Sequence, residues 1–159
     1  MNDQGSKVKK RIGKDKYFME IAHIVAKRST CMRRNVGAVL VKDGHIISTG
    51  YNGAPSGLAH CTPDTCLRNK YDVPSGERHE LCRGVHAEAN CIIQAAMHGT
   101  TIEGNTSLYT TTFPCILCLK LILNAKIKRI VYSGEYTGDD DIKQAFLDES
   151  GIEIKRIKT

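Results

Sequence analysis

The chain has 159 residues, of which 41% are hydrophobic and 25% are charged, and its formal net charge is +6. These values are typical of a single globular domain with a hydrophobic core, and they exclude a disordered, low-complexity chain. No apolar run has the length of a transmembrane helix. The polar, basic start has no apolar stretch like that of a signal peptide, which predicts a cytoplasmic protein.

Much of the positive charge lies in two terminal segments, 7–16 and 155–158. This charge can mean only that the terminal segments are solvated. It can also serve to attract an anionic partner such as a nucleotide phosphate. Charge alone does not distinguish them. We expect residues 1–15 to form a basic, flexible N-terminus and residues 16–159 to form one domain.

The chain contains seven cysteines. An odd number of cysteines in a chain without an export signal argues against a disulfide framework. The thiols are therefore expected to bind metal or to lie buried as apolar side chains.

Hydrophobic spacing predicts the first elements in chain order. They are a helix over about 15–29, a strand over 36–41, a tight turn at Asp43-Gly44 and a second strand over 45–51. The regular pattern then stops over about 52–84, where three of the four prolines and three cysteines occur. A long irregular loop inside a domain needs something to hold it, and a metal is the candidate.

Regular patterns return after this loop. The predicted elements are a helix over 86–98, a strand over 107–111, a helix over 115–125, a strand over 129–133, a helix over 139–149 and a strand over 152–157. Alternation of strands and helices predicts an α/β fold in which helices cover both faces of a sheet.

Two of these helices begin with residues that bind metals. His86-Ala87-Glu88 opens one, and Pro114-Cys115-Ile116-Leu117-Cys118 opens the other. One histidine and two thiolates make a three-ligand set, which leaves the fourth position of a tetrahedral zinc for water. Glu88, two residues after His86, is placed to serve that water rather than the metal.

Each half of this pattern has a simpler interpretation when it stands alone. A C-x-x-C segment occurs in redox pairs and zinc ribbons, and His-Ala-Glu can open any helix. The two halves together, in this order and on two helices, form the H-x-E and P-C-x-x-C signature of zinc-dependent nucleobase deaminases.

The whole sequence from about residue 16 to 154 resembles the deoxycytidylate (dCMP) deaminase family, including the late-competence operon proteins of Gram-positive bacteria. The segments that carry the resemblance are Arg28–Cys31, Val36–Val39, Gly50–Gly57, His86–Asn90 and Pro114–Cys118. The Gly50–Gly57 segment separates this family from tRNA adenosine deaminases and from cytidine deaminases that act on free nucleosides.

The resemblance implies a cytidine-deaminase-like, three-layer α/β/α fold with a mixed five-stranded sheet. It implies hydrolysis of dCMP to dUMP and ammonia, which supplies dUMP for thymidylate synthesis. His86, Cys115 and Cys118 would hold one catalytic Zn²⁺, and Glu88 would move protons. The substrate itself would contact Asn52, Tyr136 and Asn90.

The resemblance also implies a homo-oligomer, with a hexamer favoured, that is activated by dCTP, with Mg²⁺ as its counter-ion, and inhibited by dTTP. The expected partner is a small nucleotide rather than a nucleic acid or a membrane. The 5′-phosphate requires cationic or amide donors. Arg33, Arg34 and Arg83 are candidates, and the sequence does not choose among them.

Four further cysteines suggest a second, structural zinc of the kind that some family members carry. They are Cys31, Cys61, Cys66 and Cys82, and either His60 or His79 could replace one of them. The alternative is that one or more of these residues are ordinary buried thiols. Cys91 falls within a predicted helix and is expected in the core.

Two other functions stay open at this point. One is deamination of another base, such as guanine or the adenosine of tRNA, against which Gly50–Gly57 argues. The other is a non-catalytic zinc protein that assists competence. Glu88 argues against the second function, because a binding protein has no use for a carboxylate beside an open zinc position.

Overall fold

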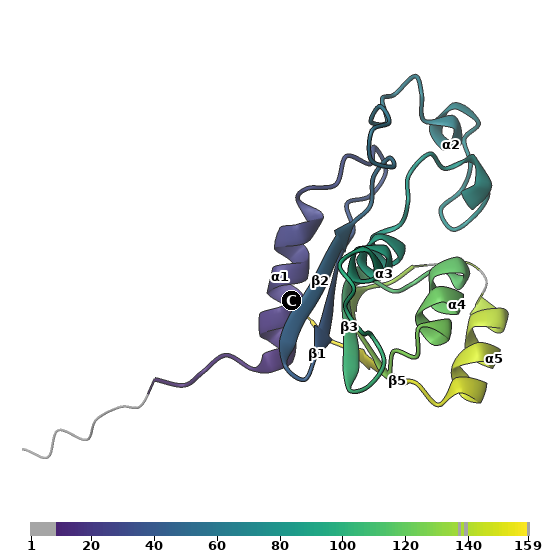
Figure 1. The fold of residues 1–159 in the computed structure, drawn as a ribbon. Helices are drawn as coiled ribbons and strands as arrows, with labels where there is room; N and C mark the ends of the chain where they lie inside the picture. The colour runs from purple at the N-terminus through teal and green to yellow at the C-terminus, as the bar shows by residue number, and fades with distance from the viewer. Residues whose placement is uncertain (1–8, 137, 139, 159) are drawn as a thin grey trace, which may run out of the picture.

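The five strands form one mixed sheet in a computed structural model that describes residues 9–136, 138 and 140–158 (Figure 1). The strands are β1 (Gly37–Lys42), β2 (His45–Tyr51), β3 (Thr106–Thr112), β4 (Arg129–Gly134) and β5 (Glu153–Arg156), and their order in the sheet is β2-β1-β3-β4-β5. β1 is antiparallel to β2 and β3, whereas β3, β4 and β5 are parallel to one another. The mixed five-stranded sheet that the resemblance implied is confirmed.

The turn between β1 and β2 has the predicted chemistry. Asp43 and Gly44 have φ values of 50° and 82°. Positive φ at both central residues defines the turn that joins two antiparallel strands most tightly, and Asp-Gly is one of its preferred sequences. The hairpin pairs Lys42 with His45 and Gly37 with Tyr51.

Helices cover both faces of the sheet, as predicted. α1 (Lys14–Ala26) packs through Phe18, Met19 and Ala22 on one face. The other face is covered by α3 (Ala87–Met97), α4 (Ile116–Asn124) and α5 (Asp140–Ser150). Each face encloses its own hydrophobic core, and the largely buried strands β1 and β3 lie between the two cores.

Two glycines bring helices close to the hairpin. A Cβ atom at Gly37 would overlap backbone atoms of Ala22 and Ala26 in α1. A Cβ atom at Gly50 would overlap backbone atoms of Ala87 and Cys91 in α3. Glycine therefore allows α1 to lie against β1 at Gly37 and the first turn of α3 to lie against β2 at Gly50.

The segment 52–84 is more structured than the sequence pattern predicts. It contains the short helix α2 (Leu67–Lys70) and a 3₁₀ turn, η1 (His79–Leu81). The base of the segment is closed by an isolated antiparallel bridge, in which Gly53 and Val85 exchange hydrogen bonds of 3.1 and 2.8 Å. We call residues 54–84 the insertion. It projects beyond one end of the sheet (Figure 1).

The predicted boundary at residue 16 is close to the start of α1 at Lys14. Residues 1–8, on which most of the flexible-terminus prediction falls, lie outside the described residues. None of the helices described has both the length and the apolar character that a membrane span requires.

Candidate active site

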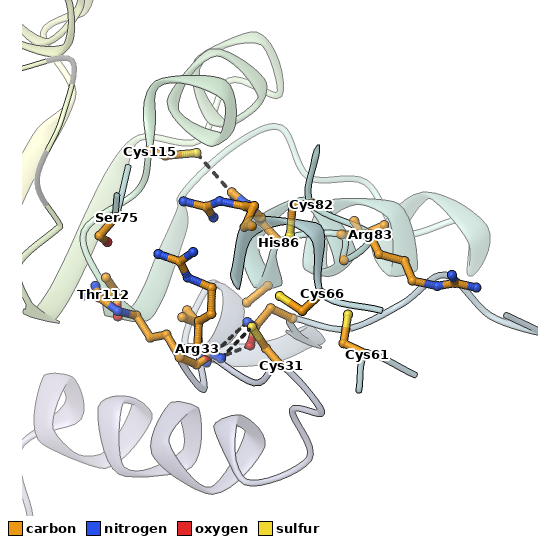
Figure 2. A pocket seen from close by; sticks show the side chains of 18 of the residues that line it. Cys31, Arg33, Cys61, Cys66, Ser75, Cys82, Arg83, His86, Thr112 and Cys115 are labelled. Atoms are coloured by element: carbon orange, nitrogen blue, oxygen red, sulfur yellow. Dashed lines mark hydrogen bonds between the residues drawn. The ribbon is translucent and has the colours of Figure 1, made fainter. Parts of the chain in front are cut away.

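The beginnings of α3 and α4 meet at one end of the sheet. His86 is the N-cap of α3, Cys115 is the N-cap of α4, and Cys118 lies in the first turn of α4. The Nδ1 atom of His86 lies 3.3 Å from Sγ of Cys115 and 3.4 Å from Sγ of Cys118. Figure 2 shows the first of these contacts as a dashed line.

These three side chains have the chemistry and spacing of a zinc site. Their potential ligand atoms all lie within 4.8 Å of one another, a property that no other group of three such residues in the described chain shares. Zinc binds thiolate at about 2.3 Å and imidazole at about 2.0 Å, so an ion between the three atoms would reach all of them. Three protein ligands leave one position for water.

The electrostatics of the two thiols favour a metal ligand. A hydrogen bond from Cys118, followed by contacts with His86, lowers the pKa of Cys115 to about 3. The same thiol–thiol contact raises the pKa of Cys118, because the two sulfurs share one proton. Both sulfurs also face the positive N-terminal end of α4, which stabilises the thiolate form.

Glu88 lies in the first turn of α3, next to these ligands, and is 4% exposed. Burial raises the pKa of Glu88 to about 6. A carboxyl group with a pKa near neutrality can both accept and return a proton under ordinary conditions, which is the property required of a proton shuttle. The geometry thus separates the three ligand candidates from a fourth, acid–base group.

A cavity of about 230 Å³ opens in front of these residues. Its walls come from the segment 31–36, the insertion, the starts of α3 and α4, and Tyr136 after β4. Among the residues that the structure describes, four arginine side chains line it, and Glu88 is the one carboxylate in its lining. The arginines are Arg33, Arg34, Arg68 and Arg83. This excess of positive charge suits an anionic ligand.

Two of the three residues predicted to contact the substrate lie at this cavity. Asn52 lines it and holds the neighbouring loop, since its Oδ1 accepts from the amide of Val36 at 2.8 Å and its Nδ2 donates to the carbonyl of Arg34 at 2.8 Å. Tyr136 also lines it. Asn90 is not in the lining, and its Nδ2 donates instead to the carbonyl oxygen of Tyr51.

Tyr136 is surrounded by polar side chains. Its hydroxyl group lies 3.0 Å from Nε2 of His79, and the guanidinium of Arg34 lies 5.1 Å from the centre of its ring. The ring of His79 is in turn 5.2 Å from that of His86. These contacts connect the metal ligands to the arginines along one wall of the cavity.

The structure also identifies Arg68, which the sequence argument did not consider. Arg68 belongs to α2 in the insertion, and its side chain is buried and lines the cavity. An arginine in an irregular segment looks like a surface residue in a single sequence. The sequence gives one hint that this part of the insertion has an interior, which is the presence of the apolar residues Cys66 and Val73. Both are buried in the structure.

The four cysteines considered for a second zinc all line the cavity, but their sulfurs are not gathered as tightly as the candidate ligand atoms of His86, Cys115 and Cys118. Electrostatic interaction with Cys66, Cys31 and Cys82 contributes to the raised pKa of Cys61, although burial contributes most. Cys82 lies closer to His86, and a hydrogen bond with that ring lowers the pKa of Cys82. Figure 2 shows Cys31, Cys61 and Cys66 on one side of the cavity and Cys82 beside His86.

The two histidines considered as replacement ligands have other contacts. Nδ1 of His60 lies 3.3 Å from Oγ1 of Thr30, and His79 contacts Tyr136 as described above. Cys91 belongs to α3 and is fully buried in the core, where the Ser48 hydroxyl donates to its carbonyl oxygen. The prediction that Cys91 is a core residue is confirmed.

The fold and this site define a class of protein, the zinc-dependent deaminases built on a five-stranded α/β/α sheet. Comparison with known proteins gives the family. The profile of the cytidine and deoxycytidylate deaminase zinc-binding region matches residues 12–134, and the chain belongs to this family.

Three relatives illustrate the similarity. The chain is 41% identical to deoxycytidylate deaminase of Mycobacterium phage D29 over 128 residues, which cover 76% of this chain and 94% of the relative. It is 34% identical to ComE operon protein 2 of Bacillus subtilis over 148 residues, covering 93% and 73%. It is 37% identical to deoxycytidylate deaminase of Schizosaccharomyces pombe over 142 residues, which are 89% of this chain but 43% of that relative.

Among solved structures, dCMP deaminase from the cyanophage S-TIM5 in complex with dCMP and dUMP superposes with a TM-score of 0.73 and 29% identity. The superposition covers 94% of this chain and 100% of the phage chain. The fold and the family inferred from the sequence are therefore confirmed.

Proposed function

We propose that this chain hydrolyses dCMP to dUMP and ammonia, and so supplies dUMP for thymidylate synthesis. The observation that carries the proposal is the pairing of a buried carboxylate, Glu88, with a three-ligand site at a cavity lined by four arginines. Relatives and a solved structure that are named for dCMP deamination support it.

His86, Cys115 and Cys118 would hold the zinc ion, which when bound supplies a water molecule whose pKa is close to neutrality. The carboxylate of Glu88 accepts a proton from the attacking water and delivers it to N3 of the pyrimidine ring. The water oxygen bonds to C4, and Glu88 then takes the remaining proton of this new hydroxyl group and delivers it to the amino group. The C4–N bond breaks, ammonia leaves, and the C4 carbonyl of dUMP forms. Burial suits Glu88 to both steps, because it keeps the pKa near the working pH.

The nucleotide is proposed to bind along the wall of the cavity that runs from His86 through His79 to Tyr136. Asn52 would contact the sugar or phosphate of the nucleotide; in support, it lines the cavity, and its Nδ2 donates to the carbonyl of Arg34. Tyr136 and Arg34 lie together further along this wall. Three arginines were considered from the sequence as donors to the 5′-phosphate. The contact with Tyr136 favours Arg34 among them.

Ammonia release from dCMP, CMP, dCTP, deoxycytidine and guanine tests this function. We expect dCMP to give the highest kcat/KM. Turnover of guanine, or of tRNA adenosine in a parallel assay, with none of dCMP would establish deamination of another base. Absence of turnover with every substrate in zinc-loaded protein would support the non-catalytic competence protein instead.

A second, structural zinc is also proposed, with Cys31, Cys61, Cys66 and Cys82 as its ligands. The support is their placement around one cavity and the electrostatic interaction of Cys61 with the other three. The amide of Arg33 lies 3.4 Å from Sγ of Cys31, a contact that stabilises a thiolate. Binding of structural zinc is strong enough to order a segment such as the insertion.

A homo-oligomer is proposed from the outer faces of two helices. α3 exposes Ile93 and Met97 at 46% and 71%, and α4 exposes Leu117 and Leu121 at 49% and 46%. Each pair lies one turn apart, so each helix presents an apolar face. Light scattering on the purified protein tests this proposal. The hexamer, regulation by dCTP with Mg²⁺ and by dTTP, and a cytoplasmic location stay predictions from the sequence.

A further inference from the structure

Arg68 is a buried cation whose hydrogen-bonding capacity is not fully used. Its side chain is 7% exposed, and its Nη2 donates to the carbonyl oxygen of Pro74 at 3.0 Å. Among the buried side-chain nitrogen and oxygen atoms of the described residues, Nε of Arg68 is the one without a hydrogen-bond partner. Within the same residues, no carboxylate forms an ion pair with Arg68.

Such an arrangement is costly for a protein. A buried N–H group without a partner and a buried charge without a counter-charge both lower stability. Arg129 shows the usual solution in this chain, because Asp15 and Glu153 lie 2.7 and 2.6 Å from its nitrogens. The burial of Arg68 without such partners indicates that its counter-charge comes from a ligand.

The cavity gives a ligand access to this group. Arg68 lines the cavity together with Tyr136. Burial is the main cause that raises the pKa of Tyr136, and the charges of Arg68 and Arg34 act in the opposite direction. The two arginines therefore lie close to the same phenol, at the end of the row of contacts that leads from His86 through His79 to Tyr136.

We propose that Arg68 binds the 5′-phosphate of the nucleotide through its buried guanidinium and thereby makes the enzyme select nucleotides over nucleosides. The proposal rests on the proposed deamination of dCMP. A phosphate dianion supplies both the counter-charge and an acceptor for Nε–H, and guanidinium is well suited to phosphate oxygens. The insertion then contributes the residue that distinguishes dCMP from deoxycytidine.

The test compares Arg68→Gln with the wild-type protein on two substrates. The ratio of kcat/KM for dCMP to kcat/KM for deoxycytidine is expected to fall at least ~10-fold, the loss of one charge-assisted contact. Lys70→Gln is the matched control, since Lys70 is exposed on the same short helix and does not line the cavity. An unchanged ratio in Arg68→Gln, including equal loss on both substrates, would overturn the proposal.

A binding measurement separates this proposal from the proposed function. Inorganic phosphate should raise the Tm of the wild-type protein and of Lys70→Gln, and should raise that of Arg68→Gln much less. If dCMP is not a substrate but this difference is found, the deamination proposal fails and the anion site stands. Equal stabilisation of all three proteins by phosphate would show that Arg68 does not bind the anion. Zinc content, measured on the same samples, shows whether the substitution also disturbs the nearby cysteines.

Discussion

Gly50 of β2 lies against the backbone of Ala87, the first residue of α3. A Cβ atom at residue 50 would overlap the carbonyl oxygen of Ala87 and the amide nitrogen of Cys91. His86 immediately precedes Ala87, so this close approach helps to position a proposed metal ligand.

We therefore expect Gly50→Ala to lower the free energy of unfolding by about 1–3 kcal/mol, the usual cost of overpacking, and to lower zinc content. Chemical denaturation and metal analysis measure the two effects. Gly13→Ala is the control, because a Cβ atom at Gly13 would meet nothing within 4 Å. Equal stability and full zinc content in both variants would show that α3 does not depend on this contact.

Glu88→Ala is expected to lower kcat for dCMP at least ~100-fold while zinc stays bound, because we propose that the carboxylate moves protons and does not bind the metal. Zinc content and turnover are measured on one sample. Glu20→Ala, at an exposed position of α1, controls for the loss of a carboxylate. Full activity of zinc-loaded Glu88→Ala would contradict the assigned role.

Cys115→Ser and Cys118→Ser should each lose the catalytic zinc and the activity, since two remaining ligands bind the ion poorly. Metal analysis after dialysis measures the loss. Cys91→Ala serves as the control, because this buried thiol lies in the core and outside the ligand group. Catalytic zinc retained at full occupancy in either serine variant would show that the ligand set is wrong.

The insertion gives a separate prediction about metal content. The wild-type chain should contain two zinc ions, and Cys66→Ser should contain one while it keeps the catalytic site. Loss of the structural ion should loosen the insertion and weaken nucleotide binding. One zinc per wild-type chain, with free thiols at Cys31, Cys61 and Cys82, would mean that other contacts hold the insertion.

Asp15 gives a prediction about pH. Its carboxylate accepts hydrogen bonds from Arg129, Lys155 and Tyr109, and the bond from Arg129 is the main reason why its pKa lies well below the ordinary value. A lowered folded-state pKa stabilises the protein above the ordinary carboxyl pKa of about 4, and this contribution is lost as the pH falls further.

Asp15→Asn should therefore lower the free energy of unfolding by ~2 kcal/mol at pH 7, and the difference from wild type should shrink below about pH 4. Denaturation at several pH values measures this. Glu103→Gln is the control, since its pair with Lys126 is exposed and contributes little. A difference that is constant from pH 7 to pH 2 would exclude this linkage.

The sequence predicts most elements of the fold to within a few residues, because apolar spacing and turn residues are local signals. The errors lie at the ends of the elements and in the insertion, where α2 and η1 were not predicted. The helix predicted to reach residue 29 ends at Ala26, and the amides of Lys27, Arg28 and Ser29 then bond three residues back instead of four. A tight last turn of this kind is common at the end of an α-helix, and the residue types in it do not mark where the helix ends.

The site was predictable where it depends on a short motif and was not where it depends on tertiary contacts. His86, Glu88, Cys115 and Cys118 come together because each opens a helix or lies in its first turn. Arg68 is different, because its burial depends on how the insertion folds over the cavity, and no periodic pattern encodes that fold. Asn90 continues the His86–Glu88 motif in sequence, yet it binds the end of β2.

The bridge between Gly53 and Val85 has a consequence for how this fold can vary. The insertion leaves and rejoins the domain at a single pair of residues joined by two hydrogen bonds. The entropy cost of closing a loop grows only with the logarithm of its length, so the segment can lengthen, shorten or be exchanged at small cost. Such a change would leave His86, which directly follows Val85, at its place on α3. Substrate choice can therefore diverge among homologues while the deamination chemistry is inherited intact.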